Sequence, residues 1–141
     1  MSFTIQLSGL QSTINRLKKT GDDIAKEVDA EFAAGAEKIS TSAKRLCPVD
    51  TGLLRSSISA SRVSFLEFEI VAQKDYAAYV EFGTKSNVTI PKGLEAYAKR
   101  FQRGDGTGQG VRAQPYFFPS VYAYQPVIVK NIIKLLREKR K

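Results

Sequence analysis

The sequence contains no histidine and no tryptophan, and it has one cysteine among its 141 residues. Without histidine, the chain cannot form a Ser-His-Asp triad, a His-ligated metal site or a histidine general base. The lone Cys47 excludes an intramolecular disulfide and a four-thiolate zinc site, and it fits a reducing compartment. The chain therefore lacks the side chains on which several large classes of enzymes and metal proteins depend.

Long apolar runs are also missing. The longest covers a handful of residues, far short of the roughly 20 that a membrane-spanning helix needs. Residues 1–7 alternate in polarity and have no basic start, so we expect no signal peptide. These features predict a protein without membrane contact that is soluble and intracellular when it is made.

What is present is an ordinary globular composition, 43% hydrophobic and 26% charged, in a length typical of one domain. We expect residues 1–141 to form that single domain, with no need for a metal ion or cofactor. The net charge of +8 is unevenly placed: residues 1–90 carry 11 basic and 11 acidic side chains, whereas residues 91–141 carry 11 basic and three acidic ones. The positive excess therefore belongs to the last third of the chain.

The strongest periodic pattern predicts a helix of about 37 Å over residues 22–46, ended by Pro48. Its apolar or small residues recur every three or four positions, at Ile24, Val28, Phe32, Gly35, Ile39, Ala43 and Leu46. A shorter helix is expected before it, from a capping box at residues 8–11 to Gly21. A last helix is expected to begin near Pro119, to kink or restart at Pro126, and to carry an apolar stripe over residues 128–136.

Alternating polarity predicts three short strands. Residues 2–7 are typical of an edge strand or strap, and residues 56–64 and 66–73 of an antiparallel hairpin with one wet face. Leu66, Phe68, Ile70 and Ala72 would form its buried face. The predicted fold class is therefore α+β, with a long N-terminal helix and a C-terminal helix packed on a small antiparallel β-sheet.

Residues 85–114 predict a flexible loop with one short helix, in which Leu94, Tyr97, Ala98 and Phe101 share a face. The glycine-rich stretch at 104–110 lacks the Gly-Lys-Ser/Thr ending of a phosphate loop, so a mobile loop is the better interpretation.

The basic last third has two interpretations. Its aromatic residues could stack on nucleic-acid bases beside the cations, or they could pack in a core or an interface. We favour packing, because aromatic residues clustered between prolines pack more often than they stack on bases. The cations that could contact DNA or an acidic partner are Lys99, Arg100, Arg103, Arg112, Lys139, Arg140 and Lys141.

Three segments carry a more specific signal: residues 48–58 (PVDTGLLRSSI), 76–84 (YAAYVEFGT) and 114–121 (QPYFFPSV). In this order, between a long N-terminal and a C-terminal helix, they closely resemble the tail-component family of tailed bacteriophages. That family comprises small neck proteins described as tail-completion or head-tail joining proteins. The resemblance spans about residues 22–137, with a departure between Thr84 and Gln114, where the family's connection can be much shorter.

The residues of these segments fit a structural task. Asp50 and Thr51 can bond amides freed at the helix end, Gly52 and Gly83 allow positive φ, and prolines fix the start of the last helix. We expect Arg55 and Glu81 to form a charge-assisted contact, within one subunit or with a neighbour. The candidate fold and assembly residues are Asp50, Thr51, Gly52, Arg55, Tyr76, Tyr79, Glu81, Phe82, Gly83, Thr84, Pro115, Phe117 and Pro119.

The resemblance implies a non-enzymatic virion protein of the neck, encoded by a phage or prophage and located in the host cytoplasm during assembly. Its copies would close into a ring, a hexamer by family analogy, around the DNA channel. The implied partners are neighbouring head-completion and tail proteins, with transient contact to DNA. Two alternatives stay open: a tail terminator that caps the tail tube, and a basic nucleic-acid-binding protein.

Overall fold

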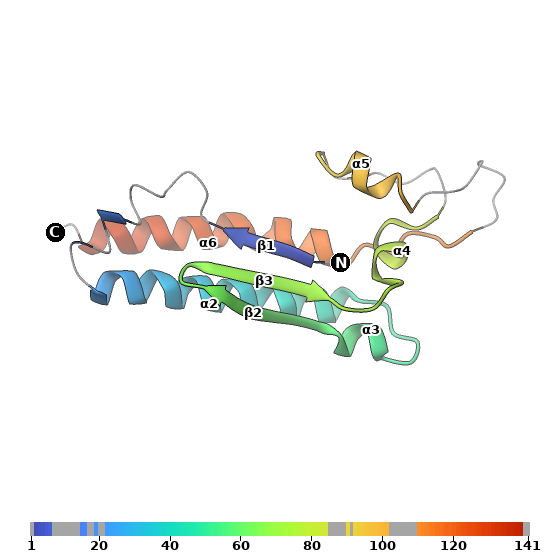
Figure 1. The fold of residues 1–141 in the computed structure, drawn as a ribbon, viewed down its shortest axis with the longest axis horizontal. Coiled ribbons are helices and arrows are strands. Elements are labelled where there is room, and N and C mark those ends of the chain that lie inside the picture. The colour runs from blue at the N-terminus through green and yellow to red at the C-terminus, as the bar shows by residue number, and fades with distance from the viewer. Residues whose placement is uncertain are drawn as a thin grey trace.

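The computed structural model describes residues 2–6, 15, 16, 19, 22–84, 90, 92–101 and 110–139, and for residues 2–6, 22 and 139 it describes the backbone alone. Two long helices lie side by side across one face of a three-stranded antiparallel sheet (Figure 1). The expected α+β class is therefore confirmed. Within the described ranges, no helix is both long enough and apolar enough to span a membrane.

Helix α2 (Asp22–Leu46) begins and ends where its repeat predicts. Val28, Phe32 and Ile39 on the predicted face are all 3% exposed or less. The assignment of Leu46 to that face is wrong, because its side chain is 46% exposed while the next residue, Cys47, is 3% exposed. The helix stops at Leu46 and the chain turns toward Pro48, so Cys47 takes the core position.

The sheet has the strand order β1-β3-β2, and both of its pairings are antiparallel. Strands β2 (Ile58–Ser64) and β3 (Glu67–Ala72) form the predicted hairpin, and β1 (Ser2–Gln6) lies along the edge of β3. The side chains of β3 alternate as expected, with Phe68, Ile70 and Ala72 in the core. The hairpin turn places Leu66 at a φ of 62°, a left-handed conformation uncommon for leucine.

Helix α6 (Phe117–Lys139) runs antiparallel to α2 (Figure 1). Pro119 lies in its first turn, as predicted. Of the two effects expected of Pro126, a kink or a restart of the helix, the restart is wrong, because α6 continues past it. Pro126 lies on the exposed side, where water can satisfy the carbonyl left without a partner. The two helices approach closely at Gly35, where an added Cβ would lie 2.3 Å from Cγ1 of Ile128.

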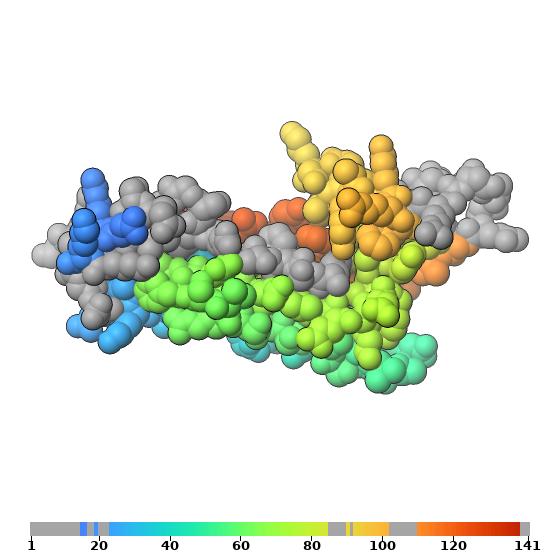
Figure 2. Space-filling view, in the orientation of Figure 1, coloured from blue at the N-terminus to red at the C-terminus, as the bar shows by residue number. Residues whose placement is uncertain are grey.

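Three short helices complete the described fold: α3 (Leu53–Ser56), α4 (Ala77–Phe82) and α5 (Glu95–Ala98). Helix α5 is the one predicted inside residues 85–114, and its Ala98 is fully buried. Figure 2 shows the α5 segment lying over α4 at one end of the molecule. The glycine-rich stretch at 104–109 and the capping box at 8–11 lie outside the described residues, whereas Asn15, Arg16 and Lys19 are helical, as expected.

Candidate functional site

Glu81 joins two of the three sequence motifs. It lies on α4, is 2% exposed, and accepts backbone hydrogen bonds from the start of α6. Its Oε2 accepts the N–H groups of Tyr116 and Phe117, both at 2.8 Å, and its Oε1 accepts that of Phe118 at 3.0 Å. The first N–H groups of a helix have no partner within the helix and carry its positive dipole end, so a carboxylate is well placed there. Glu81 therefore caps α6 from a distant element.

The electrostatics of Glu81 combine two opposing effects. Burial raises the pKa of the Glu81 carboxyl above its usual range, although the three backbone hydrogen bonds favour its charged form. The neighbouring Tyr116 is fully buried, and its pKa is raised by burial and by the nearby carboxyl of Glu81. Glu81 and Tyr116 are therefore both shielded from water, and the hydrogen bonds of Glu81 stabilise the fold.

The chain before α6 is tied to the end of α4 by its backbone. The N–H of Gln114 donates to the carbonyl of Val80 at 2.8 Å, and that of Thr84 donates to the carbonyl of Val111 at 3.0 Å. The Thr84 hydroxyl in turn accepts the N–H of Val111 at 2.8 Å. Together with the Glu81 bonds these contacts form what we call the α4–α6 clamp, residues 80–84 with 111–118.

Gly83 is required at the centre of this clamp. Its φ is 66°, and a Cβ added there would lie 2.6 Å from the backbone nitrogen of Ala113 and 2.8 Å from the carbonyl oxygen of Val111. Both a positive φ and the close approach of backbone exclude a side chain at this position. The predicted positive φ at Gly83 is therefore confirmed, and so is that at Gly52, whose φ is 81°.

An aromatic cluster covers the clamp. Phe82 lies at its centre, with ring centroids 5.7 Å from Tyr97, 6.3 Å from Phe101 and 5.8 Å from Phe118. Tyr79 packs edge to face on Phe101 at 5.2 Å. These contacts favour the packing interpretation of the aromatic residues, because the rings meet one another.

The first motif turns α2 into the sheet through α3. The Thr51 hydroxyl accepts the N–H of Leu53 at 3.4 Å, which agrees with the expected role of Thr51. Asp50 is exposed and forms no such bond with the described residues. The end of α2 and the first motif together leave three aliphatic side chains in solvent, which we call the turn patch: Leu46, Val49 and Leu53 are 46%, 55% and 52% exposed.

The structure does not bring Arg55 and Glu81 into the within-subunit ion pair proposed from the sequence. Glu81 is committed to the backbone of α6, and Arg55 on α3 is exposed. Arg55 does lie close enough to Cys47 to lower the pKa of that thiol, although burial raises it by more. Cys47 is thus a buried thiol, and a contact of Arg55 with another subunit stays a prediction.

Sequence reasoning missed the contact that fixes the hairpin on α2. The carboxylate of Asp29 pairs with Arg62 on β2, and its Oδ1 accepts the N–H of Leu66 in the hairpin turn at 2.9 Å. The guanidinium of Arg62 also lies 6.0 Å from the ring centroid of Phe68. The partners are separated by 33 and 37 residues along the chain, so no local pattern could have indicated this contact.

The candidate cationic residues are not gathered into one surface. Lys99 and Arg100 follow α5 at one end of the molecule, whereas the C-terminus of α6 with Lys139 lies at the other end (Figure 1). Arg112 is exposed in the clamp. Arg103, Arg140 and Lys141 lie outside the described residues.

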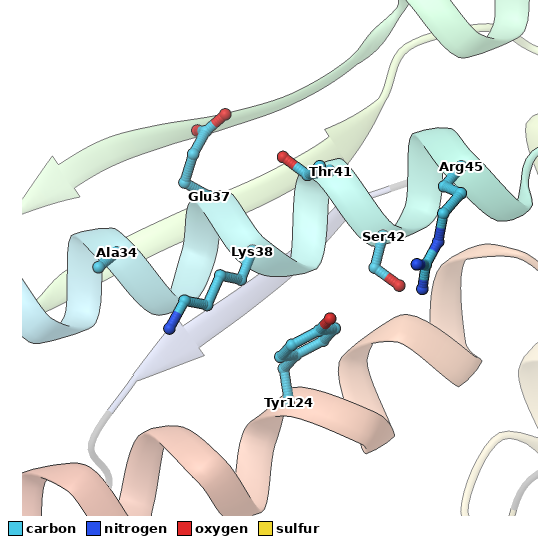
Figure 3. Close-up of a pocket in the computed structure, with 7 residues that line it drawn as sticks. All are labelled: Ala34, Glu37, Lys38, Thr41, Ser42, Arg45 and Tyr124. Atoms are coloured by element: carbon cyan, nitrogen blue, oxygen red, sulfur yellow. The ribbon is translucent and has the colours of Figure 1, made fainter.

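A shallow groove of about 410 Å³ runs between α2 and α6. Figure 3 shows Lys38, Ser42 and Arg45 on the side of α2 that faces α6, where Tyr124 lies, while Glu37 points away. The described part of the chain contains no cluster of carboxylate and thiol ligands that could hold a metal ion.

Comparison with known proteins places the chain in a family. No curated protein and no solved structure matches it. A family model described as "Bacteriophage HK97-gp10, putative tail-component" matches residues 11–83, which is just over half of the 141 residues and includes the first motif and the second as far as Gly83, with Glu81. The protein therefore belongs to the HK97-gp10-like family of structural components of bacteriophage tails.

Proposed function

We propose that this tail component completes the phage tail and joins it to the DNA-filled head, as a ring of identical subunits around the DNA channel. Its place would be the virion neck, after assembly in the host cytoplasm. Family membership supports the tail role. The position in the neck, the assembly into a ring and the joining of head to tail go beyond the family match and are what we propose.

The observation that carries the proposal is a pair of unlike apolar patches at opposite ends of β2. The turn patch precedes β2, and a second patch, which we call the hairpin patch, lies at the other end of the strand, where Val63 and Phe65 are 55% and 37% exposed. Exposed apolar clusters mark interaction sites. A head-to-tail contact joins two different surfaces of the same subunit, and it closes into a ring when the rotation allows.

The clamp supports the same role by making the subunit stiff. Glu81 and the backbone of residues 111–114 tie α6 to α4, and Asp29 ties the hairpin to α2. A subunit whose elements are fixed in this way presents its two patches at a constant angle. Constant geometry is what a closed ring requires of every contact.

Electron microscopy of particles made without the gene tests the proposal. We expect filled heads and finished tails that remain separate. Particles that still join would exclude the joining role. Tails of uncontrolled length would instead indicate a tail terminator, because the tube would then lack the component that stops its growth.

A further inference from the structure

The outer side of α6 carries a second apolar stripe that no described element covers. Tyr122, Pro126, Val129 and Ile133 recur at spacings of four, three and four residues, and so lie on one face of the helix. Tyr122, Val129 and Ile133 are 47%, 44% and 44% exposed. We call these four residues the outer stripe. It differs from the core stripe of α6, whose Ile128 and Ile132 are buried.

Cations border the outer stripe. A groove of about 710 Å³ runs along it, and the described residues that line this groove include Lys130, Lys134 and Arg137, with Glu138 as its one carboxylate. The stripe is roughly 16 Å long at 1.5 Å per residue. A partner that fits would therefore present an apolar centre of that length with acidic side chains beside it.

We propose that the outer stripe of α6 is the docking site for an acidic protein of the phage particle, distinct from the subunits of the ring. This inference deepens the proposed function and rests on it, since the partner is then a neighbouring head or tail component. The stripe lies beyond residues 11–83, so the family match does not cover it.

Charge argues against a second copy of this chain as the occupant. The chain carries +8, and its turn patch is flanked by Arg45 and Arg55 against the single carboxylate of Asp50. Two such surfaces would bring like charges together. Duplex DNA fits poorly for another reason: it offers phosphates to the cations but no apolar surface to the side chains between them.

The test uses filled heads and finished tails purified separately from particles made without the gene. Purified protein is sedimented with each, and the bound fraction is measured against protein concentration and salt. We expect the wild type to bind one of the two, and to bind it more weakly as salt is raised. Val129→Asn with Ile133→Asn should weaken that binding at least tenfold, because the buried centre of an interface carries most of its energy.

Charge reversal gives the second arm. Lys130→Glu, Lys134→Glu and Arg137→Glu together should weaken binding at least as much as the apolar change. The matched control reverses three cations of α2, Lys26, Lys38 and Lys44, and should leave binding within about twofold of wild type if the contact is local. Circular dichroism and thermal unfolding establish that each variant is folded.

Four outcomes would overturn the inference. Binding unchanged in the outer-stripe variants excludes the site, and if those variants also restore joining, the proposed function survives without it. A loss of self-association in the Asn variants would make a second copy the occupant. A loss of duplex DNA binding with particle binding intact would make DNA the occupant. Wild-type protein that binds neither heads nor tails would refute the proposed function together with the inference.

Discussion

Glu81 links two helices through a single side chain, because it lies on α4 and accepts the N–H groups at the start of α6. A buried carboxylate that accepts three backbone N–H groups replaces the water that a helix N-terminus would otherwise bind. The sequence motif identified Glu81 but suggested Arg55 as its partner. The error has a physical reason. A backbone N–H group can donate a hydrogen bond to a carboxylate as a guanidinium does, but the order of residue types in the sequence does not indicate which backbone groups will do so.

Removal of this carboxylate should be costly. We expect Glu81→Ala to lower the free energy of unfolding by on the order of 3 kcal/mol or more, because three buried donors lose their acceptor. Urea unfolding followed by circular dichroism measures the change. The matched control, Glu37→Ala, removes an exposed glutamate of α2 and should stay within about 0.5 kcal/mol of wild type. Equal effects of the two substitutions would contradict the capping role.

The same carboxyl should impose a pH dependence with a definite sign. Burial raises the pKa of Glu81 above its ordinary value of 4.5, so between 4.5 and the raised pKa the folded protein holds more protons than the unfolded one. In that window the free energy of unfolding falls as pH rises. We expect the stability of the wild type relative to Glu81→Gln to decline from pH 4.5 upward and then level off. A relative stability that grows with pH would contradict this, because it would mean that the hydrogen bonds lower the pKa of Glu81 by more than burial raises it.

At the scale of elements, the long-range polar contacts set how the layers meet. Asp29 binds both β2 and the hairpin turn, and between the helices the hydroxyls of Ser120 and Ser42 share a hydrogen bond of 3.1 Å. The amide of Asn131 donates to the carboxylate of Glu31 at 2.8 Å. The Asp29 contacts fix α2 against the sheet, and the other two fix α6 against α2, both of which apolar packing alone specifies less sharply.

Asp29 provides the test at this scale. We expect Asp29→Ala to destabilise the protein by roughly 2 to 4 kcal/mol, since it leaves the N–H of Leu66 buried without an acceptor and removes the partner of Arg62. Arg62→Ala should cost only about 1 kcal/mol, because half of the Arg62 side chain is in water. Denaturant unfolding of both variants makes the comparison. A larger loss for Arg62→Ala would mean that the ion pair, and not the turn amide, is the main contribution.

The elements themselves were largely predictable from local patterns. The repeat of α2, the alternation of β3 and the proline in the first turn of α6 each lie within one element, where side-chain periodicity reflects burial directly. Leu46 and Cys47 show the limit, since the position at which a helix stops decides which of two adjacent residues enters the core. The Asp29 contacts and the clamp depend on residues 27 to 37 positions apart, and no local pattern contains them.

At the scale of the whole molecule, we interpret the apolar patches at the surface as the contacts by which the protein assembles with its neighbours. The turn patch and hairpin patch lie at opposite ends of β2, and the outer stripe follows α6. The sequence located the net positive charge in the last third but could not show which of its residues face solvent. The structure adds that Lys130, Lys134 and Arg137 border an apolar face, which makes a protein partner a better fit for them than DNA.

Head-to-tail assembly makes a distinctive prediction for mixed variants. Val49→Asn with Leu53→Asn disables the turn patch, and Val63→Asn with Phe65→Ser disables the hairpin patch. Each variant alone should remain monomeric, and an equimolar mixture should stop at dimers, since one intact patch of each kind remains. Light scattering measures the mass of the assemblies that each sample forms. If the free wild type is monomeric, purified tails are added as the template on which the subunits assemble. Val111→Asn, at a residue 50% exposed outside both patches, is the control and should assemble as wild type. Rings formed by either patch variant alone would refute this interface.

The most direct test of the central claim is to return the protein to particles that lack it. Filled heads and finished tails from phage without the gene are mixed with purified wild-type protein, and joined particles are counted by electron microscopy and by infectivity. We predict that joining is restored, with a ring of this protein visible at the junction. Heads and tails that stay separate in the presence of folded protein, or that join equally well without it, would contradict the proposed function.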